Sequence, residues 1–195
     1  AKGGLCSMQQ SPQVSFKCGP LAVNTLLRLT QKGAPAENPI LKKAESTTEG
    51  TTLTQVKDWA DQVGLKYQMA KRSKGAPFVT PAVMHWGVEH FATIVGKEKD
   101  RYHIQDPTFD TDGQVWITAK ALEQETDGYF LIPSDKPLPE GWTTVSADEG
   151  NAVHGKGICQ GRNGNNQGCP APKQDPCSCE TCDANGGPKG CGVGM

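Results

Sequence analysis

A cysteine, a histidine and an aspartate in this chain are of the types that together perform thiol chemistry. A catalytic thiol must be ionised at working pH, a histidine must hold and return its proton, and a third group must orient the imidazole. Cys18, His90 and Asp106 supply these groups in that order along the sequence. The sequence therefore raises the hypothesis of a thiol-dependent enzyme, provided that the fold brings the three side chains together.

Cys18 stands just before a segment whose apolar residues recur at near-helical spacing. Pro20 suits the first turn of a helix, and Gly33 ends the pattern. The N-terminus of a helix carries a partial positive charge, which stabilises a nearby anion by about 0.3 to 1 kcal/mol. The position of Cys18 would therefore favour its thiolate.

His90 and Asp106 flank a predicted β-hairpin. The stretches "HFATIVGKE" (90–98) and "RYHIQDP" (101–107) are rich in β-branched and aromatic residues, and a charged turn at 97–100 separates them. In a hairpin the start of the first strand lies beside the end of the second. We therefore expect His90 and Asp106 to be neighbours.

The remaining periodic segments predict an α+β fold, with helices packed on an antiparallel sheet. Further helices are expected over 37–46, 51–65 and 118–128, with Thr52 or Thr54 capping the second. Strands are expected over 66–72, 76–86, 90–98, 101–107 and 128–133.

Charge and hydropathy narrow the classes of partner. The 20 lysines and arginines nearly balance 21 acidic residues, so no strong field directs the chain to nucleic acid or to an anionic membrane. The longest apolar runs are only a few residues, too short to span a bilayer. We expect no nucleic-acid partner, no membrane partner and no cofactor.

The cysteines divide the chain unevenly. Two lie near the start and six lie in the last part, at Cys159, Cys169, Cys177, Cys179, Cys182 and Cys191. We expect a domain over 1–133, a linker over 134–158, and a Gly/Pro/Cys-rich tail over 159–195 that has too few apolar residues to fold unaided. The tail would be disulfide-bonded, metal-binding or disordered; Cys179 and Cys182 have the gap used by zinc knuckles, without a second matching pair.

Three stretches together resemble a known enzyme family. "KCGPLAVNTLL", "HWGVEHFATIVG" and "YHIQDPTFD" are similar to the bacteriocin-processing cysteine peptidases, a papain-like family that cuts leader peptides after a double glycine. The resemblance covers about residues 8–133. It implies a papain-like fold, a peptide or protein substrate, and roles for Cys18 as nucleophile, His90 as general base and acid, and Asp106 as the group that orients the imidazole.

The family also implies an oxyanion-stabilising glutamine about six residues before the cysteine. Pro12 occupies that position here, and Gln13 lies five residues before Cys18, so Gln13 is our choice and Gln10 the reserve. A Gln13 amide paired with the Cys18 backbone N–H would supply the oxyanion hole. Where the family often has an acid directly before the cysteine this chain has Lys17, and a nearby cation favours a thiolate.

Cys18 has two other interpretations. Free cysteine is among the most buried residue types, so Cys18 could be an ordinary core residue. It could also form a disulfide with Cys6, which would act as a redox latch on the thiol.

The other candidate residues have structural interpretations as well. His85 competes with His90 but lies before the Gly87 break and would need a different partner. His103 is expected to be structural, and Asp110 and Asp112 would be loop acids. Three aromatic residues are expected to fill the core or line a cleft: Trp86, Phe91 and Trp116.

The function expected from these residues is hydrolysis of a peptide bond, and two alternatives stay open. A papain-like acyltransferase or transglutaminase would share the first chemical step, and a degenerate relative would bind peptides without turnover. The tail resembles the Gly/Cys-rich segments that precede the repeat shell of bacterial RHS/YD-repeat proteins. That resemblance implies a secreted or cell-surface bacterial protein in which this chain is the N-terminal part of a longer polypeptide.

Overall fold

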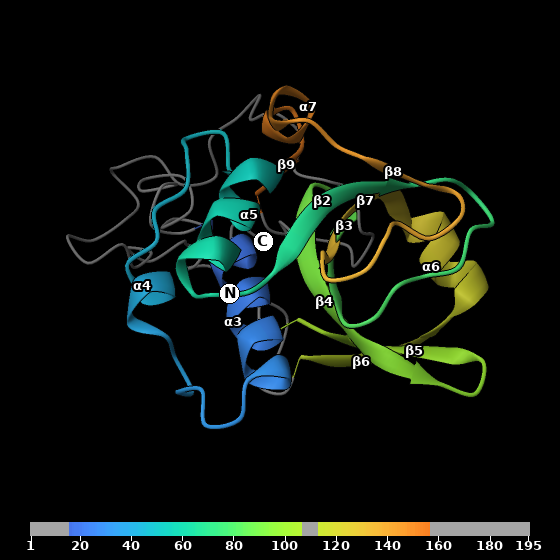
Figure 1. Ribbon diagram of the computed structural model, residues 1–195, viewed down its shortest axis with the longest axis horizontal. Coiled ribbons are helices and arrows are strands. Elements are labelled where there is room, and N and C mark those ends of the chain that lie inside the picture. Colours follow the sequence, from blue (N-terminus) through green and yellow to red (C-terminus); the bar gives the residue numbers. More distant parts are fainter. Residues whose placement is uncertain (1–15, 107–112, 157–195) are drawn as a thin grey trace, which may run out of the picture.

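Two helices pack beside each other against one side of an antiparallel sheet (Figure 1). They are α3 (Cys18–Thr30) and α5 (Leu53–Gln62). The computed structural model describes residues 16–106 and 113–156. The expectations for Cys6, Gln10, Gln13 and the cysteine-rich tail lie outside these residues. The α+β architecture expected from the sequence is confirmed.

All neighbouring strands of the main sheet are antiparallel, in the order β6-β5-β4-β3-β7-β2-β8. The strands are β2 (Tyr67–Arg72), β3 (Ala82–Trp86), β4 (His90–Glu98), β5 (Arg101–Gln105), β6 (Gln114–Thr118), β7 (Thr126–Pro133) and β8 (Trp142–Thr144). Strand β3 is shorter than the stretch 76–86 expected from its composition, and β6 was not anticipated.

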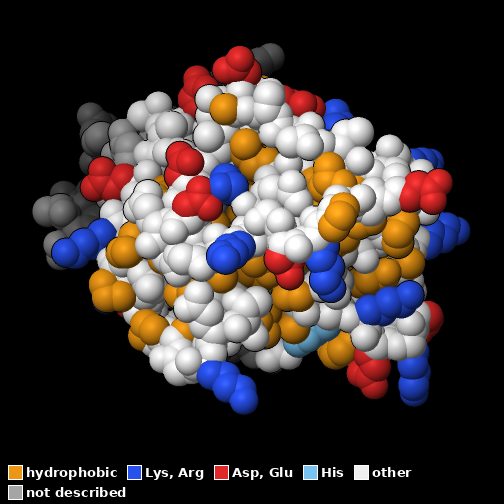
Figure 2. Space-filling view, viewed as in Figure 1, with side chains coloured by type: hydrophobic (Ala, Val, Ile, Leu, Met, Phe, Trp, Pro, Cys, Tyr) orange, Lys and Arg blue, Asp and Glu red, His pale blue; other side chains and the backbone are white. Residues whose placement is uncertain are grey.

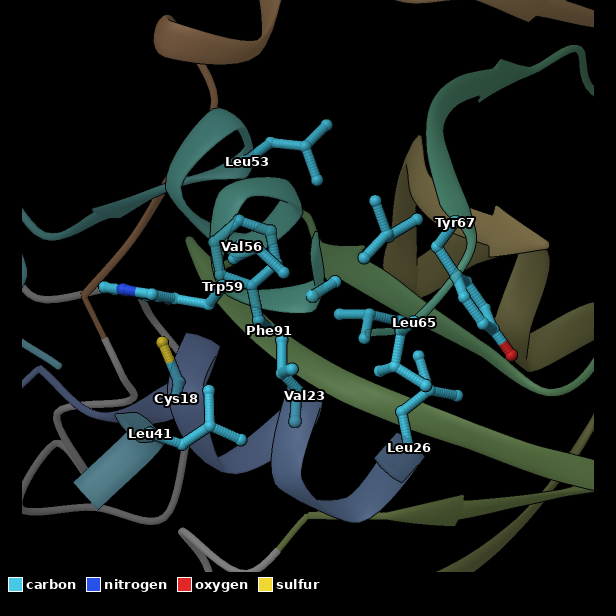
Figure 3. Close-up of a cluster of buried hydrophobic side chains, with 14 of the residues drawn as sticks. Cys18, Val23, Leu26, Leu41, Leu53, Val56, Trp59, Leu65, Tyr67 and Phe91 are labelled. Atoms are coloured by element: carbon cyan, nitrogen blue, oxygen red, sulfur yellow. The ribbon is translucent and has the colours of Figure 1, made fainter. Parts of the chain in front are cut away.

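Side chains alternate between two apolar clusters on the two sides of the sheet. Val83 and Leu131 pack toward α3 and α5, whereas their neighbours Met84 and Phe130 pack on the opposite side. That second side is covered by α6 (Ala119–Glu125), whose Leu122 is fully buried. Figure 3 shows the first cluster, in which Cys18 lies with helix and strand side chains.

Helices α4 and α5 begin at residues whose side chains cap them, whereas α3 begins after Lys17 without a side-chain cap. The Thr52 side chain accepts a hydrogen bond from the Gln55 backbone N–H, and the Gln55 side chain accepts one from the Thr52 N–H, which forms a capping box at α5. The short helix α4 (Pro39–Lys42) is capped by Asn38. The choice between Thr52 and Thr54 as the cap of α5 is thereby settled for Thr52.

The hairpin of β4 and β5 turns at two residues, because Glu98 pairs with Arg101. Lys99, in the turn, has a φ of 54°. A register shift between Ile94 and Gly96 bends β4. The hairpin therefore returns the chain toward the start of β4.

Residues 134–156, where the sequence analysis expects a linker, form ordered elements against the domain. After β8 come α7 (Ala147–Asn151) and β9 (His154–Gly155), and β9 pairs with β1 (Thr51–Thr52) in a separate two-stranded sheet (Figure 1). Trp142, Val145 and Val153 are buried, which supplies the apolar contacts that hold this stretch.

Basic and acidic side chains are interspersed on the face shown in Figure 2, in keeping with the near balance of charge in the sequence. Within the ranges 16–106 and 113–156, no helix has both the length and the apolar character needed to cross a membrane.

Candidate active site

Cys18 is the first residue of α3 and its side chain is buried, with 2% of the residue exposed. The structure contains it as a free thiol. The next residue is Gly19. A Cβ at this position would collide with the side-chain methyl of Thr51 and would lie 3.1 Å from a methyl of Val56. The Cys-Gly pair therefore lets α3 begin in close contact with β1 and α5.

His90 and Asp106 are brought together by the hairpin. His90 opens β4, Asp106 directly follows β5, and the His90 Nε2 atom lies 2.5 Å from Asp106 Oδ2. Both side chains are buried, so this contact is shielded from water. A buried carboxylate in that position accepts the Nε2 proton and fixes the orientation of the ring.

The Cys18 side chain lies near enough to His90 to raise the pKa of its imidazole. Burial disfavours the charged imidazolium, but hydrogen bonds with Asp106 and with Cys18 outweigh it and raise the pKa of His90 to about 9. At neutral pH this favours an imidazolium placed between a sulfur and a carboxylate. The structure thus places sulfur, imidazole and carboxyl in one contiguous group.

His85 has partners of its own. Its Nδ1 atom lies 2.6 Å from Asp127 Oδ2, and its Nε2 atom donates to the His154 carbonyl oxygen at 2.7 Å. The ring also packs on Phe91, with centroids 4.8 Å apart. His85 therefore belongs to a second histidine–aspartate pair, next to the first but distinct from it.

The remaining candidates occupy different environments. His103 stacks on Trp116, and its Nε2 lies 3.1 Å from the Gln114 side-chain oxygen. Phe91 is buried in the core, whereas Trp116 is 44% exposed on β6. Lys17 directs its ammonium to the Ala44 carbonyl oxygen.

Several expected residues cannot be placed in this site. Asp110 and Asp112 lie outside the described residues, as do Gln13 and Gln10, so the oxyanion glutamine stays a prediction. Among residues 16–106 and 113–156, no group of three or more metal-ligating side chains is gathered together.

Gly155 is the residue near the thiol that the sequence analysis missed. A Cβ built on it would lie 3.1 Å from Cys18 Sγ and 2.5 Å from a Phe91 ring carbon. No signal in the sequence marked this residue, because a strand as short as β9 has no hydrophobic periodicity.

The sequence matches the model of the peptidase C39 family over residues 8–137. The chain belongs to this family, and it is a cysteine peptidase with the papain-like α+β fold. The resemblance to double-glycine bacteriocin-processing peptidases is therefore confirmed.

The chain is also similar to solved peptidase structures, while no curated protein matches it. One is a double-glycine-motif protease from an AMS/PCAT transporter in complex with the leader peptide, with 18% identity, 60% of this chain and 83% of that chain covered, and a TM-score of 0.41. Another is the peptidase domain of Streptococcus mutans ComA, with 17% identity, 60% and 89% covered, and a TM-score of 0.42.

Proposed function

We propose that the protein hydrolyses a peptide bond through Cys18, His90 and Asp106. The single observation that supports this proposal is the buried contact of His90 with Asp106, beside a Cys18 side chain that raises the pKa of His90. Membership of a peptidase family supports a peptide or protein as the substrate.

In the first half-reaction the Cys18 thiolate attacks the carbonyl carbon of the scissile bond. The imidazolium of His90 then gives its proton to the leaving amine, and a thioester joins the acyl group to the sulfur. Because Nε2 of His90 faces Asp106, the proton passes through Nδ1. Asp106 keeps the ring in place for this transfer and stays ionised.

In the second half-reaction water takes the position of the amine. His90, now neutral, accepts a proton as the water attacks the thioester, which releases the acid and restores the ion pair. The Cys18 backbone N–H and the Gln13 amide would stabilise the oxyanion in both halves, each donor being worth about 3 to 4 kcal/mol in related chemistry.

The decisive experiment compares the native protein with Cys18→Ala on a library of unstructured peptides that includes sequences copied from residues 157–195. We expect hydrolysis by the native protein and none by Cys18→Ala. Cys6→Ala is the matched control, since it removes the other N-terminal thiol and should leave hydrolysis unchanged. Equal hydrolysis by native protein and Cys18→Ala would remove the assigned nucleophile.

The alternative to an enzyme is a domain that binds peptides without cleaving them. Alkylation by iodoacetamide separates the two, because an active-site thiolate held by an imidazolium reacts well below pH 8, whereas an ordinary thiol has a pKa near 8.5. Acyl transfer is distinguished by adding a primary amine, which would give an amide product in place of the acid.

A natural substrate and a location can also be proposed for this activity. We infer that the natural substrate is a longer polypeptide that contains this domain, at a secreted or cell-surface bacterial location. Peptides from residues 157–195 that are cut in preference to scrambled versions would support this; equal cutting of both would count against it.

A further inference from the structure

The thiol of this peptidase is covered by the protein itself. Cys18 is 2% exposed and His90 is fully buried, so a peptide carbonyl has no open path to the sulfur in this conformation. Gly155, which comes close to the sulfur in space, belongs to a strand 137 residues further along the chain (155 minus 18). A substrate that reaches the sulfur must displace groups packed against it, and the backbone of Gly155 is one such group.

The covering strand is held by its backbone, as an extended peptide is held. The Val153 carbonyl oxygen accepts a hydrogen bond from the Leu53 N–H at 2.9 Å, and β9 pairs with β1 in antiparallel register. On its other side the Lys156 N–H donates to the Glu89 carbonyl oxygen at 2.7 Å. Proteins bind extended peptides by hydrogen bonds between the main chain of the peptide and an exposed main-chain edge of the protein.

The strand lies against both parts of the proposed catalytic group. Its Thr51 partner neighbours Gly19 on the side of Cys18, and its Glu89 partner directly precedes His90. The His154 carbonyl is fixed separately by His85. The residues around 155 therefore occupy the space in which a substrate's reacting bond would have to lie.

Only glycine fits at position 155. A Cβ there would lie 2.5 and 2.8 Å from two Phe91 ring carbons and 3.1 Å from Cys18 Sγ. The φ angle of Gly155 is outside the left-handed region, so the restriction comes from space and not from backbone strain. The close approach of β9 to the thiol thus depends on the absence of one side chain.

This strand is an addition to the peptidase domain. The family model matches residues 8–137, and α7 and β9 follow that region. Strand β9 pairs only with β1 among the described strands, in a sheet separate from the seven-stranded one. Strand β9 therefore lies beyond the residues that the family model matches, and it is attached to the core through the buried Val153 next to it.

We propose that residues 153–156 are an intramolecular occupant of the peptide-binding groove, which blocks Cys18 until the segment is displaced. The proposal rests on the proposed function, since it makes the groove around Cys18 the substrate site. A tethered segment competes at a high effective concentration, so a free peptide must displace it to reach the thiol. Lys156 pairs with Glu89 at 3.3 Å on the exposed side of the segment, so a like charge at residue 156 would weaken its retention by a modest amount.

The test measures the rate at which iodoacetamide alkylates Cys18 in the full chain at pH 7, with the modified cysteine identified by mass spectrometry. Gly155→Ala should expel the strand and raise that rate about tenfold or more over the native protein. Gly96→Ala is the control, because a Cβ at residue 96 meets no heavy atom within 4 Å. Equal rates for native protein and Gly155→Ala would overturn the proposal.

A second variant guards against simple unfolding. Lys156→Glu places a like charge beside Glu89 without touching the core, and should raise the alkylation rate by a few-fold while the circular dichroism spectrum and melting temperature stay native. If Gly155→Ala fails to fold, Lys156→Glu decides: an unchanged rate rejects the proposal.

Hydrogen exchange provides the reciprocal measurement. Alkylation of Cys18 in the native protein adds bulk where Gly155 lies, so the amides of Lys156 and Leu53 should exchange faster than in unmodified protein. Failure of the proposed function is recognised separately, by variants that accelerate alkylation without giving any hydrolysis. The inference fails if the protein hydrolyses peptides but substitutions at residues 155 and 156 leave the alkylation rate of Cys18 unchanged.

Discussion

The Nε2 atom of His90 lies 2.5 Å from the Oδ2 atom of Asp106, although the two residues are 16 positions apart in the sequence. The contact is possible because β4 and β5 are joined by a two-residue turn and run antiparallel. Because the contact is buried, it lies in a region of low dielectric constant, where an ion pair is stronger and its loss costs more stability. The pair therefore links the stability of the fold to the protonation of one histidine.

The first prediction concerns the pH dependence of stability. The pKa of His90 is raised from 6.5 to about 9 by its hydrogen bonds with Asp106 and Cys18, against the opposing effect of burial. Because the folded pKa is above the unfolded one, the stabilisation is fully present below pH 6.5 and is lost as pH rises through 9. The free energy of unfolding should fall by up to about 3 kcal/mol across this range.

Asp106→Asn tests the cause of that slope. Other thiols ionise in the same range, so the comparison is between urea unfolding curves of native protein and variant at pH 6.5 and pH 9.5. The asparagine removes the negative charge that favours the imidazolium, so the decline should shrink. An identical decline in both proteins would mean that His90 does not couple to Asp106.

The second prediction separates the histidines. His90→Ala should lower kcat/KM by about 100-fold or more, because a general acid–base typically contributes that much. His103→Ala is the matched control, since that ring lies on the strand surface against Trp116 and away from the thiol. Steady-state hydrolysis of one peptide measures both. A similar loss in the two variants would point to a general effect on folding, and no loss in His90→Ala would exclude the assigned role.

The third prediction concerns a buried cation far from the site. The Arg72 side chain is 3% exposed, pairs with Glu123 at 2.6 Å, and lies 3.6 Å from the centroid of the Phe78 ring. Arg72→Met should lower the free energy of unfolding by about 2 to 4 kcal/mol, because it removes the donor to the Ala76 carbonyl oxygen and to Glu123 and the stacking on Phe78.

Lys57→Met is the control for that experiment. Lys57 pairs with Asp61 one helical turn away on the surface of α5, and such pairs are worth about 0.3 to 0.5 kcal/mol. Thermal melts of both variants would show a large shift for residue 72 and a small one for residue 57. Equal shifts in melting temperature would mean that burial does not determine how much stability is lost with an ion pair.

The sequence predicted that His90 and Asp106 are neighbours because the signals for the hairpin are local. Pro20 and Gly33 indicate a helix that the structure shows over Cys18–Thr30, and the charged turn at 97–100 separates two strands. Each pattern depends on residues adjacent in the chain, so elementary propensities are sufficient. His85 was set apart from His90 because it needed another partner, which the structure identifies as Asp127.

The rest of the site could not be predicted, because it depends on contacts between distant segments. Strand β9 is two residues long, and nothing in "VHGKG" distinguishes it from a flexible connection. Its position follows from buried Val153 and from hydrogen bonds to the N–H of Leu53 and the carbonyl of Glu89. Sequence patterns indicate which residues prefer burial, but they do not indicate which residues they will contact.

The fourth prediction concerns the glycine that follows the nucleophile. A Cβ on residue 19 would collide with the Cγ2 methyl of Thr51, so Gly19→Ala must move the start of α3 or the β1 strand. Overpacking of this kind costs about 1 to 3 kcal/mol, and here the displacement would fall on Cys18. Gly19→Ala should therefore lower both the melting temperature and the rate of peptide hydrolysis.

Thr51→Ser supplies a matched rescue of that defect. It deletes the methyl with which the new Cβ collides but keeps the hydroxyl, which donates to the Phe16 carbonyl oxygen at 3.1 Å. The double variant should recover most of the stability and activity lost in Gly19→Ala, whereas Thr51→Ser alone should change both only slightly. Because the two residues touch, their effects should be strongly non-additive in a double-mutant cycle. Additive losses would show that residue 19 is restricted by the backbone of α3 rather than by the packing of Thr51 against the helix start.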